Sequence, residues 1–220
     1  TFVPGNVTHD VAGSWLEENT VTFNPANGKF IFSGDNTTIT TLATSNNNSF
    51  FNFKITGNPV TAESELDIDG ATEIEGTLAL DENNIHFNDF KNVRIGAGGG
   101  AANTLTYSSN CTITVGNSVD FNATGGTITC TGTGIIETKS QPTVLGTFTC
   151  GTGTVKYFKN GAQDISFTDP ANNSTYHNLV IDGAAGAKSA QGTLTVGGDL
   201  TIDNSICLLY TSDAADDWFC

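Results

Sequence analysis

The sequence predicts an all-β protein, specifically a right-handed parallel β-solenoid with coils of about 20 residues. Three observations support this fold class. Thr is abundant, Gly accounts for 25 residues of a 220-residue chain and only 14 % of that chain is charged, a composition that favours strands joined by tight turns. Short segments with alternating apolar and polar residues recur, as in strands with one buried face. Similar segments also recur at near-constant offsets, which is typical of repeat architectures.

One repeated element joins an aromatic residue, an Asn and a run of alternating apolar residues. Its copies are FFNFKITG at 50–57, FKNVRIG at 90–96 and YHNLVIDG at 176–183. The shared Asn residues are Asn52, Asn92 and Asn178. Asn tolerates unusual backbone angles and bonds nearby backbone groups, so we interpret these residues as corner residues. Lys54 and Arg94 occupy equivalent positions on the polar face of the first two copies.

A shorter period lies between GTITCTGTGI at 126–135 and GTFTCGTGTV at 146–155, which align at an offset of 20. A coil of fixed circumference requires such an offset, whereas an antiparallel sandwich does not, although a tandem β-sandwich remains the alternative. The right-handed course follows from the general crossover rule. Because Cys111, Cys130 and Cys150 share parity with apolar neighbours, we expect three free thiols stacked inward in one column of successive coils.

Together these elements resemble the secreted repeat proteins of bacteria and of marine phage, in which GxW, GtvtFnG, tfyNLtI and LtVxGxLtI segments follow one another. The matching segments lie at 13–23, 28–34, 50–55, 153–161, 176–181 and 194–202. The resemblance implies an extracellular, cell-surface or virion location and a role like that of adhesins, surface filaments and tail-fibre shafts. GAGGGAAN at 96–103 replaces the usual short linker, which predicts an irregular coil there.

The two ends of the chain suggest a segment of a longer protein. No Met occurs, and the repeat pattern stops abruptly near residue 206. The following string, CLLYTSDAADD at 207–217, resembles a translated transposase sequencing adapter. We therefore expect a solenoid repeat region over 1–206 and a non-native or disordered tail over 207–220.

Charge and hydropathy exclude several classes of partner. The chain has 8 Lys and Arg residues against 23 Asp and Glu residues, a formal net charge of −15. Nucleic-acid binding needs clustered basic residues, so no nucleic-acid partner is expected. No run of 18 apolar residues occurs, so no membrane insertion is expected.

The densest group of candidate ligands is acidic. Glu63, Glu65, Asp67 and Asp69 lie at alternate positions, which in a strand places all four on one face, with Leu66 and Ile68 on the other. Such oxygen ligands could bind Ca²⁺, while the alternative interpretation is a solvated face that discourages edge pairing. His9, His86 and His177 lack transition-metal spacing. We expect no catalytic residues and no cofactor other than this possible calcium ion.

The sequence thus favours a non-enzymatic structural or adhesive segment of an extracellular or virion surface protein. It would act as a spacer or as a multivalent shaft that binds glycans or a cell-surface partner. Two alternatives stay open at this point. One is a carbohydrate-active β-helix domain that binds or cleaves polysaccharide, and the other is a calcium-stabilised binding module.

Overall fold

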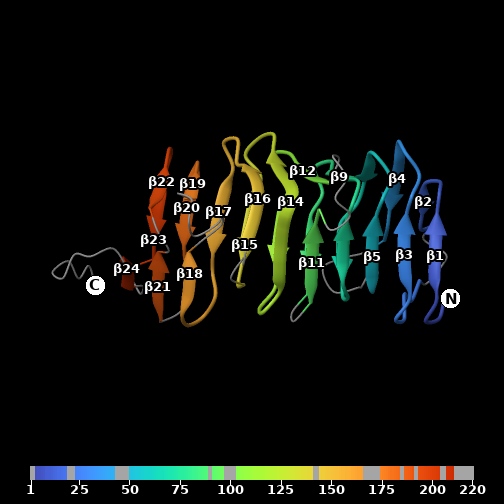
Figure 1. Cartoon of the computed structure of the whole chain (residues 1–220), viewed down its shortest axis with the longest axis horizontal. Helices are drawn as coiled ribbons and strands as arrows, with labels where there is room; N and C mark the ends of the chain where they lie inside the picture. Colours follow the sequence, from blue (N-terminus) through green and yellow to red (C-terminus); the bar gives the residue numbers. More distant parts are fainter. Residues whose placement is uncertain are drawn as a thin grey trace.

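In the computed structural model the chain stacks as a parallel β-solenoid (Figure 1). The structure describes residues 3–18, 23–42, 50–88, 91–96, 103–140, 144–165, 174–183, 186–190, 193–203 and 207–210, with backbone alone for 144–146, 174 and 207–210. All strand pairs within these ranges are parallel, which excludes the antiparallel sandwich. Among the same residues no helix is long and apolar enough to cross a membrane.

The largest sheet consists of two strand columns that share one long strand, β14. Its strands are β1 (Thr8–Val11), β2 (Trp15–Leu16), β3 (Lys29–Phe32), β4 (Thr37–Thr40), β5 (Asn52–Ile55), β6 (Val60–Ala62), β8 (Thr72–Ile74), β9 (Thr77–Leu80), β11 (Asn92–Ile95), β12 (Thr104–Tyr107), β14 (Asp120–Cys130) and β16 (Val144–Thr149). The first part of β14 pairs with β11 and its second part with β12. Each coil before β14 therefore supplies two neighbouring strands to this sheet, whereas the coils from β17 onward supply none.

A seven-stranded sheet forms a further wall of the solenoid. Its strands are β7 (Leu66–Ile68), β10 (Ile85–Phe87), β13 (Thr112–Val115), β15 (Ile135–Thr138), β17 (Thr154–Tyr157), β20 (Asn178–Ile181) and β23 (Leu200–Ile202). Two small sheets complete the fold. They contain β18 (Gln163–Ile165), β21 (Ala187–Ala190) and β24 (Cys207–Tyr210) in one, and β19 (Ser174–Tyr176) and β22 (Leu194–Val196) in the other.

Coil length varies along the stack instead of holding to the predicted period. Val60 pairs with Leu78 across a short coil, whereas Asn92 pairs with Asp120 across a much longer one. Extra residues enter mainly at the corners, so most strand pairs keep one register; the pairing of β14 with β16 shifts register between Ala123 and Thr127. The predicted irregular linker at 96–103 lies within the longer of these two coils, although 97–102 fall outside the described residues.

The core is built by period-two alternation, because inward positions along each wall are buried while outward positions remain partly exposed. At the N-terminal end the inward residues are aromatic. The Phe50 ring lies 5.3 Å from those of Phe30 and Phe32 and 5.4 Å from that of Phe53, measured between centroids. These rings fill several coils in succession and bury the large apolar area that drives folding.

Glycine is required where one corner of each coil lies directly on the next. Gly34, Gly57 and Gly76 follow β3, β5 and β8 at equivalent positions. A Cβ on Gly57 would lie 2.1 Å from the Gly34 carbonyl oxygen, and a Cβ on Gly76 would lie 2.1 Å from the Gly57 carbonyl oxygen. Only a residue without a side chain fits such a close approach.

The corner role predicted for the repeated Asn residues is confirmed for two of them. The Oδ1 atoms of Asn52 and Asn178 accept the backbone N–H groups of Ala71 and Asp199, each at 3.0 Å, in the following coil. Asn92 is exposed at the start of β11. The three copies do not share one wall, however, because β5 and β11 belong to the large sheet and β20 to the seven-stranded sheet.

The cysteines are placed differently from the prediction of a single column. Cys130 pairs in register with Tyr107, while Cys111 lies at the corner before β13. The coils around Cys111 are longer than the predicted period, so Cys111 does not share a column with Cys130, although both side chains point inward as their parity predicted. All three thiols are free; Cys111 and Cys130 are buried, and Cys150 is half-buried.

The C-terminal boundary also differs from the expectation. Strand β24 pairs in parallel with β21, Ala187 lying opposite Cys207. The stacked backbone therefore extends past residue 206 by one strand. The rest of the predicted tail, 211–220, lies outside the described residues.

Candidate functional site

The four predicted acidic ligands lie in different environments along and beside β7. Glu63 is exposed and its Oε2 accepts the Thr40 hydroxyl at 3.2 Å. The Oε1 atom of Glu65 lies 3.5 Å from Nε2 of His86. Asp67, predicted to face solvent, is only 5 % exposed. Side chains of the next coil therefore cover part of the row that the alternation pattern placed outward.

Asp67 and Asp69 share one hydrogen-bond donor. The side-chain nitrogen of Asn88, which follows β10 in the next coil, donates to Oδ1 of Asp67 at 2.7 Å and to Oδ1 of Asp69 at 2.6 Å. Burial raises the pKa of Asp67. The Asn88 hydrogen bond opposes this shift, and the charge of Asp69 reinforces it. The two carboxylates thus lie close together, bridged by an amide.

The calcium hypothesis gains no geometric support from this arrangement. Among the residues that the structure describes, no three or more His, Cys, Asp or Glu side chains are grouped so as to hold a metal ion. A cation needs several converging oxygens, whereas here the amide nitrogen of Asn88 lies between the two carboxylates.

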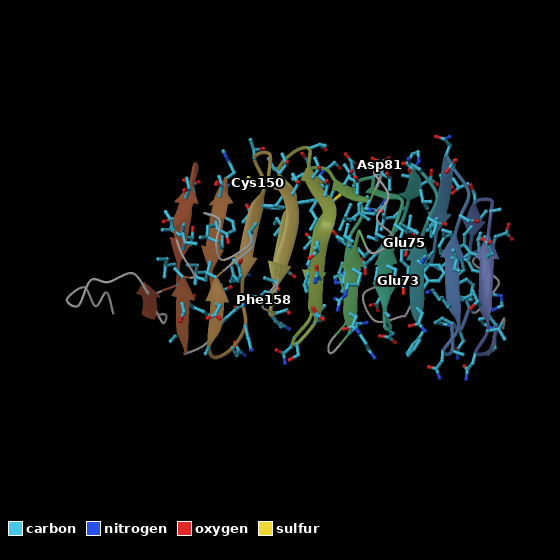
Figure 2. All side chains as sticks on the ribbon, viewed as in Figure 1. Glu73, Glu75, Asp81, Cys150 and Phe158 are labelled. Atoms are coloured by element: carbon cyan, nitrogen blue, oxygen red, sulfur yellow. The ribbon has the colours of Figure 1, made fainter. Side chains whose placement is uncertain are left out.

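A ladder of alternating charge crosses the outer face of the large sheet. The Nζ atom of Lys54 lies 3.2 Å from Oε2 of Glu73 and 2.7 Å from Oε1 of Glu75, and Nζ of Lys29 lies 3.1 Å from the same Glu73 oxygen. Figure 2 labels both glutamates on neighbouring positions of this face. Burial would raise the pKa of Glu73, but hydrogen bonds from Lys29 and Lys54 outweigh it and lower that pKa.

Arg94 continues this ladder. It lies opposite Glu73 in the register between β8 and β11, so Lys54, Glu73 and Arg94 occupy one row in three successive strands. Its guanidinium also pairs with the carboxylate of Asp120. Half-exposed ion pairs contribute little stability individually. These contacts link successive coils and leave neither Lys54 nor Arg94 beside the acidic row of β7.

A buried polar side chain, Gln163, links three coils inside the C-terminal half. Its Nε2 atom donates to the carbonyl oxygens of Thr138 and Ser140 at 3.1 and 3.0 Å. Its Oε1 atom accepts the backbone N–H of Lys159 at 3.2 Å. The side chain therefore satisfies backbone groups that the irregular corners leave without strand partners.

Lys188 lies opposite Gln163 in the next coil and is fully buried. Its Nζ atom donates to the carbonyl oxygens of Lys159 and Gly161 at 2.6 and 3.2 Å and to Oε1 of Gln163 at 3.3 Å. Burial lowers the pKa of Lys188, and the charge of Lys159 lowers it further. Carbonyl oxygens replace water around this ammonium group, which fixes the loop over residues 159–161.

A second buried group surrounds Tyr107 in the large sheet. Its hydroxyl has no hydrogen-bonded nitrogen or oxygen partner among the described residues and faces the thiol of Cys130. Burial raises the pKa of Tyr107 well above its usual value, with smaller contributions from the neighbouring cysteines. The thiol of Cys111 instead donates to the Leu80 carbonyl oxygen at 3.4 Å. A thiol is a weak hydrogen-bonding group, so the Tyr107 side chain and the two buried thiols contribute to the core mainly through packing.

Sequence reasoning missed both Lys188 and Gln163. Lys188 lies in the alternating segment AKSA, where parity would have placed it with Ala190 on the inward face. A lysine at an inward position was the available signal. Comparison with known proteins adds no assignment, since no family model, no curated protein and no solved structure matches this chain.

Proposed function

We propose that the chain is a non-enzymatic shaft segment of an extracellular or virion surface protein, acting as a spacer or a multivalent binding surface. The observation that carries this proposal is the uninterrupted parallel stack, in which each coil rests on the previous one over the described length. A stack of this kind is extended along one axis and presents equivalent outward positions at regular intervals.

The side-chain contacts between coils support a mechanical role. Aromatic rings fill the interior across successive coils, Asn side chains bond from corner to corner, and Lys–Glu pairs link outward rows. Most of these polar contacts join residues about one coil apart rather than converging on one point. Catalysis needs convergent groups in a concave, water-excluding site, so this distribution favours a structural function.

Small-angle X-ray scattering on the purified 220-residue chain tests the shaft proposal. We expect the distance distribution of a rod, with a cross-section that stays constant along one long axis. A glycan-array experiment in parallel tests the adhesive part. A compact, isotropic distance distribution would contradict the shaft proposal regardless of the array result.

The second candidate is a carbohydrate-active enzyme, and the Asp67–Asp69 pair is the observation in its favour. Two carboxylates that share one donor, one of them with a raised pKa, resemble the acid and base pairs of glycoside hydrolysis. The low exposure of Asp67 weighs against it. New reducing ends released from a panel of acidic and neutral polysaccharides, and lost in Asp67→Asn and Asp69→Asn, would establish this activity instead.

A further inference from the structure

A cavity of about 430 Å³ opens where the seven-stranded sheet ends and each coil turns toward the next wall. It is lined by Asn117, Lys139, Phe158, Lys159 and Asn160. Figure 2 labels Phe158 in the lower half of the stack. The volume is in the range of small-ligand sites and is far larger than the space that one water molecule or one simple ion occupies.

Successive coils supply the lining residues. Asn117 lies shortly after β13, Lys139 directly after β15 and Phe158 directly after β17. The backbone N–H of Lys139 donates to the Val115 carbonyl oxygen at 3.0 Å, and that of Phe158 donates to the Thr138 carbonyl oxygen at 3.0 Å. The cavity therefore spans three stacked coils, with its backbone fixed by the inter-coil ladder.

The wall that carries Lys159 and Asn160 is held from inside. Lys159 donates its backbone N–H to Gln163, and its carbonyl oxygen accepts the ammonium group of Lys188. The buried amide and the buried ammonium thus fix the loop whose other side lines the cavity. A fixed wall lowers the entropy lost when a ligand binds.

The cavity gathers positive charge in an otherwise acidic chain. The Nζ atoms of Lys139 and Lys156 lie 4.9 and 5.5 Å from the centroid of the Phe158 ring. Lys156 is already paired with Asp182 at 2.9 Å. Within the described ranges, no carboxylate oxygen forms an ion pair with the ammonium nitrogen of Lys139 or Lys159. Two cations therefore line this cavity without a carboxylate partner among those residues.

These side chains define the chemistry of a ligand. Two ammonium groups attract and donate to an anionic group, and two amide side chains can both donate to and accept from hydroxyl groups. The Phe158 ring adds an apolar wall. We propose that this cavity binds an anionic saccharide, with Lys139 and Lys159 contacting its acidic group, Asn117 and Asn160 its hydroxyl groups and Phe158 its apolar face.

Nucleic acid fits the same cavity poorly. A nucleic-acid site tracks a phosphate backbone with many cations, whereas three lysines lie around Phe158 in a chain of net charge −15. The saccharide site rests on the proposed function in one respect, namely that an extracellular shaft is exposed to saccharides. The rod is tested by scattering without ligand, so the two proposals can fail separately.

Isothermal titration calorimetry on the full 220-residue chain tests the proposal. The probes are a trigalacturonate, a sulfated disaccharide, a neutral trisaccharide of similar size and sodium sulfate. We expect saturable binding of at least one acidic sugar, with a Kd below about 1 mM, and at least tenfold weaker binding of the neutral sugar and of sulfate. The two acidic probes decide whether the recognised group is a carboxylate or a sulfate ester.

Paired variants localise the binding. Lys139→Gln combined with Lys159→Gln should weaken binding of the acidic sugar at least tenfold, with an unchanged circular dichroism spectrum. Lys91→Gln is the matched control, because Lys91 also lies over a Phe ring, that of Phe51 at 5.4 Å, but outside the cavity. Equal binding by the double variant and the control would overturn the proposal. So would the absence of saturable binding by both acidic sugars, or equally tight binding of sulfate alone.

Discussion

Substitution of Gly57 by Ala tests the close contact between successive corners. The new Cβ would lie 2.1 Å from the Gly34 carbonyl oxygen and 3.0 Å from Cγ2 of Val60. Since a carbon rarely comes within about 3 Å of such an atom, the two coils must separate locally by roughly 1 Å. That movement stretches the hydrogen bonds from Gly57 N–H to Phe32 and from Thr77 N–H to Gly57, now 3.0 and 3.1 Å long.

The expected cost follows from these two bonds. Each backbone hydrogen bond contributes about 0.5–1.5 kcal/mol, and a buried group left without a partner costs about 1–3 kcal/mol. Gly57→Ala should therefore destabilise the fold by roughly 2–4 kcal/mol. Urea unfolding followed by circular dichroism measures the midpoint, and hydrogen exchange should show faster exchange confined to the coils next to Gly57.

Gly13→Ala is the matched control, because no atom lies within 4 Å of the Cβ it would create. Its effect should stay below about 0.5 kcal/mol. If both variants unfold at the same urea concentration, or if exchange near Gly57 is unchanged, the corner contact does not constrain the stack.

Three further substitutions test buried groups through the same unfolding measurement. Lys188→Met removes the ammonium donor of the Lys159 and Gly161 carbonyl oxygens and should destabilise by about 1–3 kcal/mol; an unchanged midpoint would contradict the role given to this ammonium group. Burial raises the pKa of Asp67 above its usual 3.8, so the folded chain binds more protons just above pH 3.8 and stability falls as pH rises through that window. Asp67→Asn should therefore stabilise the chain at pH 7 by up to about 1 kcal/mol, an advantage that disappears below pH 3.8. The control Glu63→Gln, at an exposed position, should change stability at pH 7 by less than about 0.5 kcal/mol. Tyr107→Phe removes a hydroxyl that faces only a thiol and should change stability by less than about 0.5 kcal/mol; a large loss would reveal a strong hydrogen bond there.

The fold class was predictable from the sequence because inward and outward positions alternate along each strand and similar strands recur at near-constant offsets. Lys54 and Arg94, predicted to be equivalent, do lie in one row of the large sheet. The prediction did not include Glu73, which lies between them in the intervening coil. The segment around Glu73 lacks the aromatic–Asn motif, so the sequence repeats do not identify it as a further copy.

The sequence could not predict which residues of different coils become neighbours, because this depends on the length of the corners. Each coil carries strands of the same pattern on different walls, so the motif alone could not assign Asn178 to the seven-stranded sheet. Unequal coil lengths displaced Cys111 from the column predicted for it. Asp67 is covered by side chains one coil away, and only the register between β7 and β10 brings Asn88 and His86 beside it. Local alternation carries no information about such neighbours.

The last strand of the seven-stranded sheet shows that each coil depends on the next one to cover its apolar residues. Leu200 and Ile202 in β23 are 49 % and 38 % exposed, whereas Leu179 and Ile181, their register partners in β20, are completely buried. The same apolar pattern is therefore buried where a further coil covers it and exposed to solvent where none does. The free energy of folding of such a molecule is approximately a sum of contributions from single coils and from the interfaces between neighbouring coils. Local unfolding should begin at β23 and advance coil by coil. A destabilising substitution near β23 should therefore shorten the folded part of the stack, whereas one in the middle should divide the stack into two halves that unfold independently.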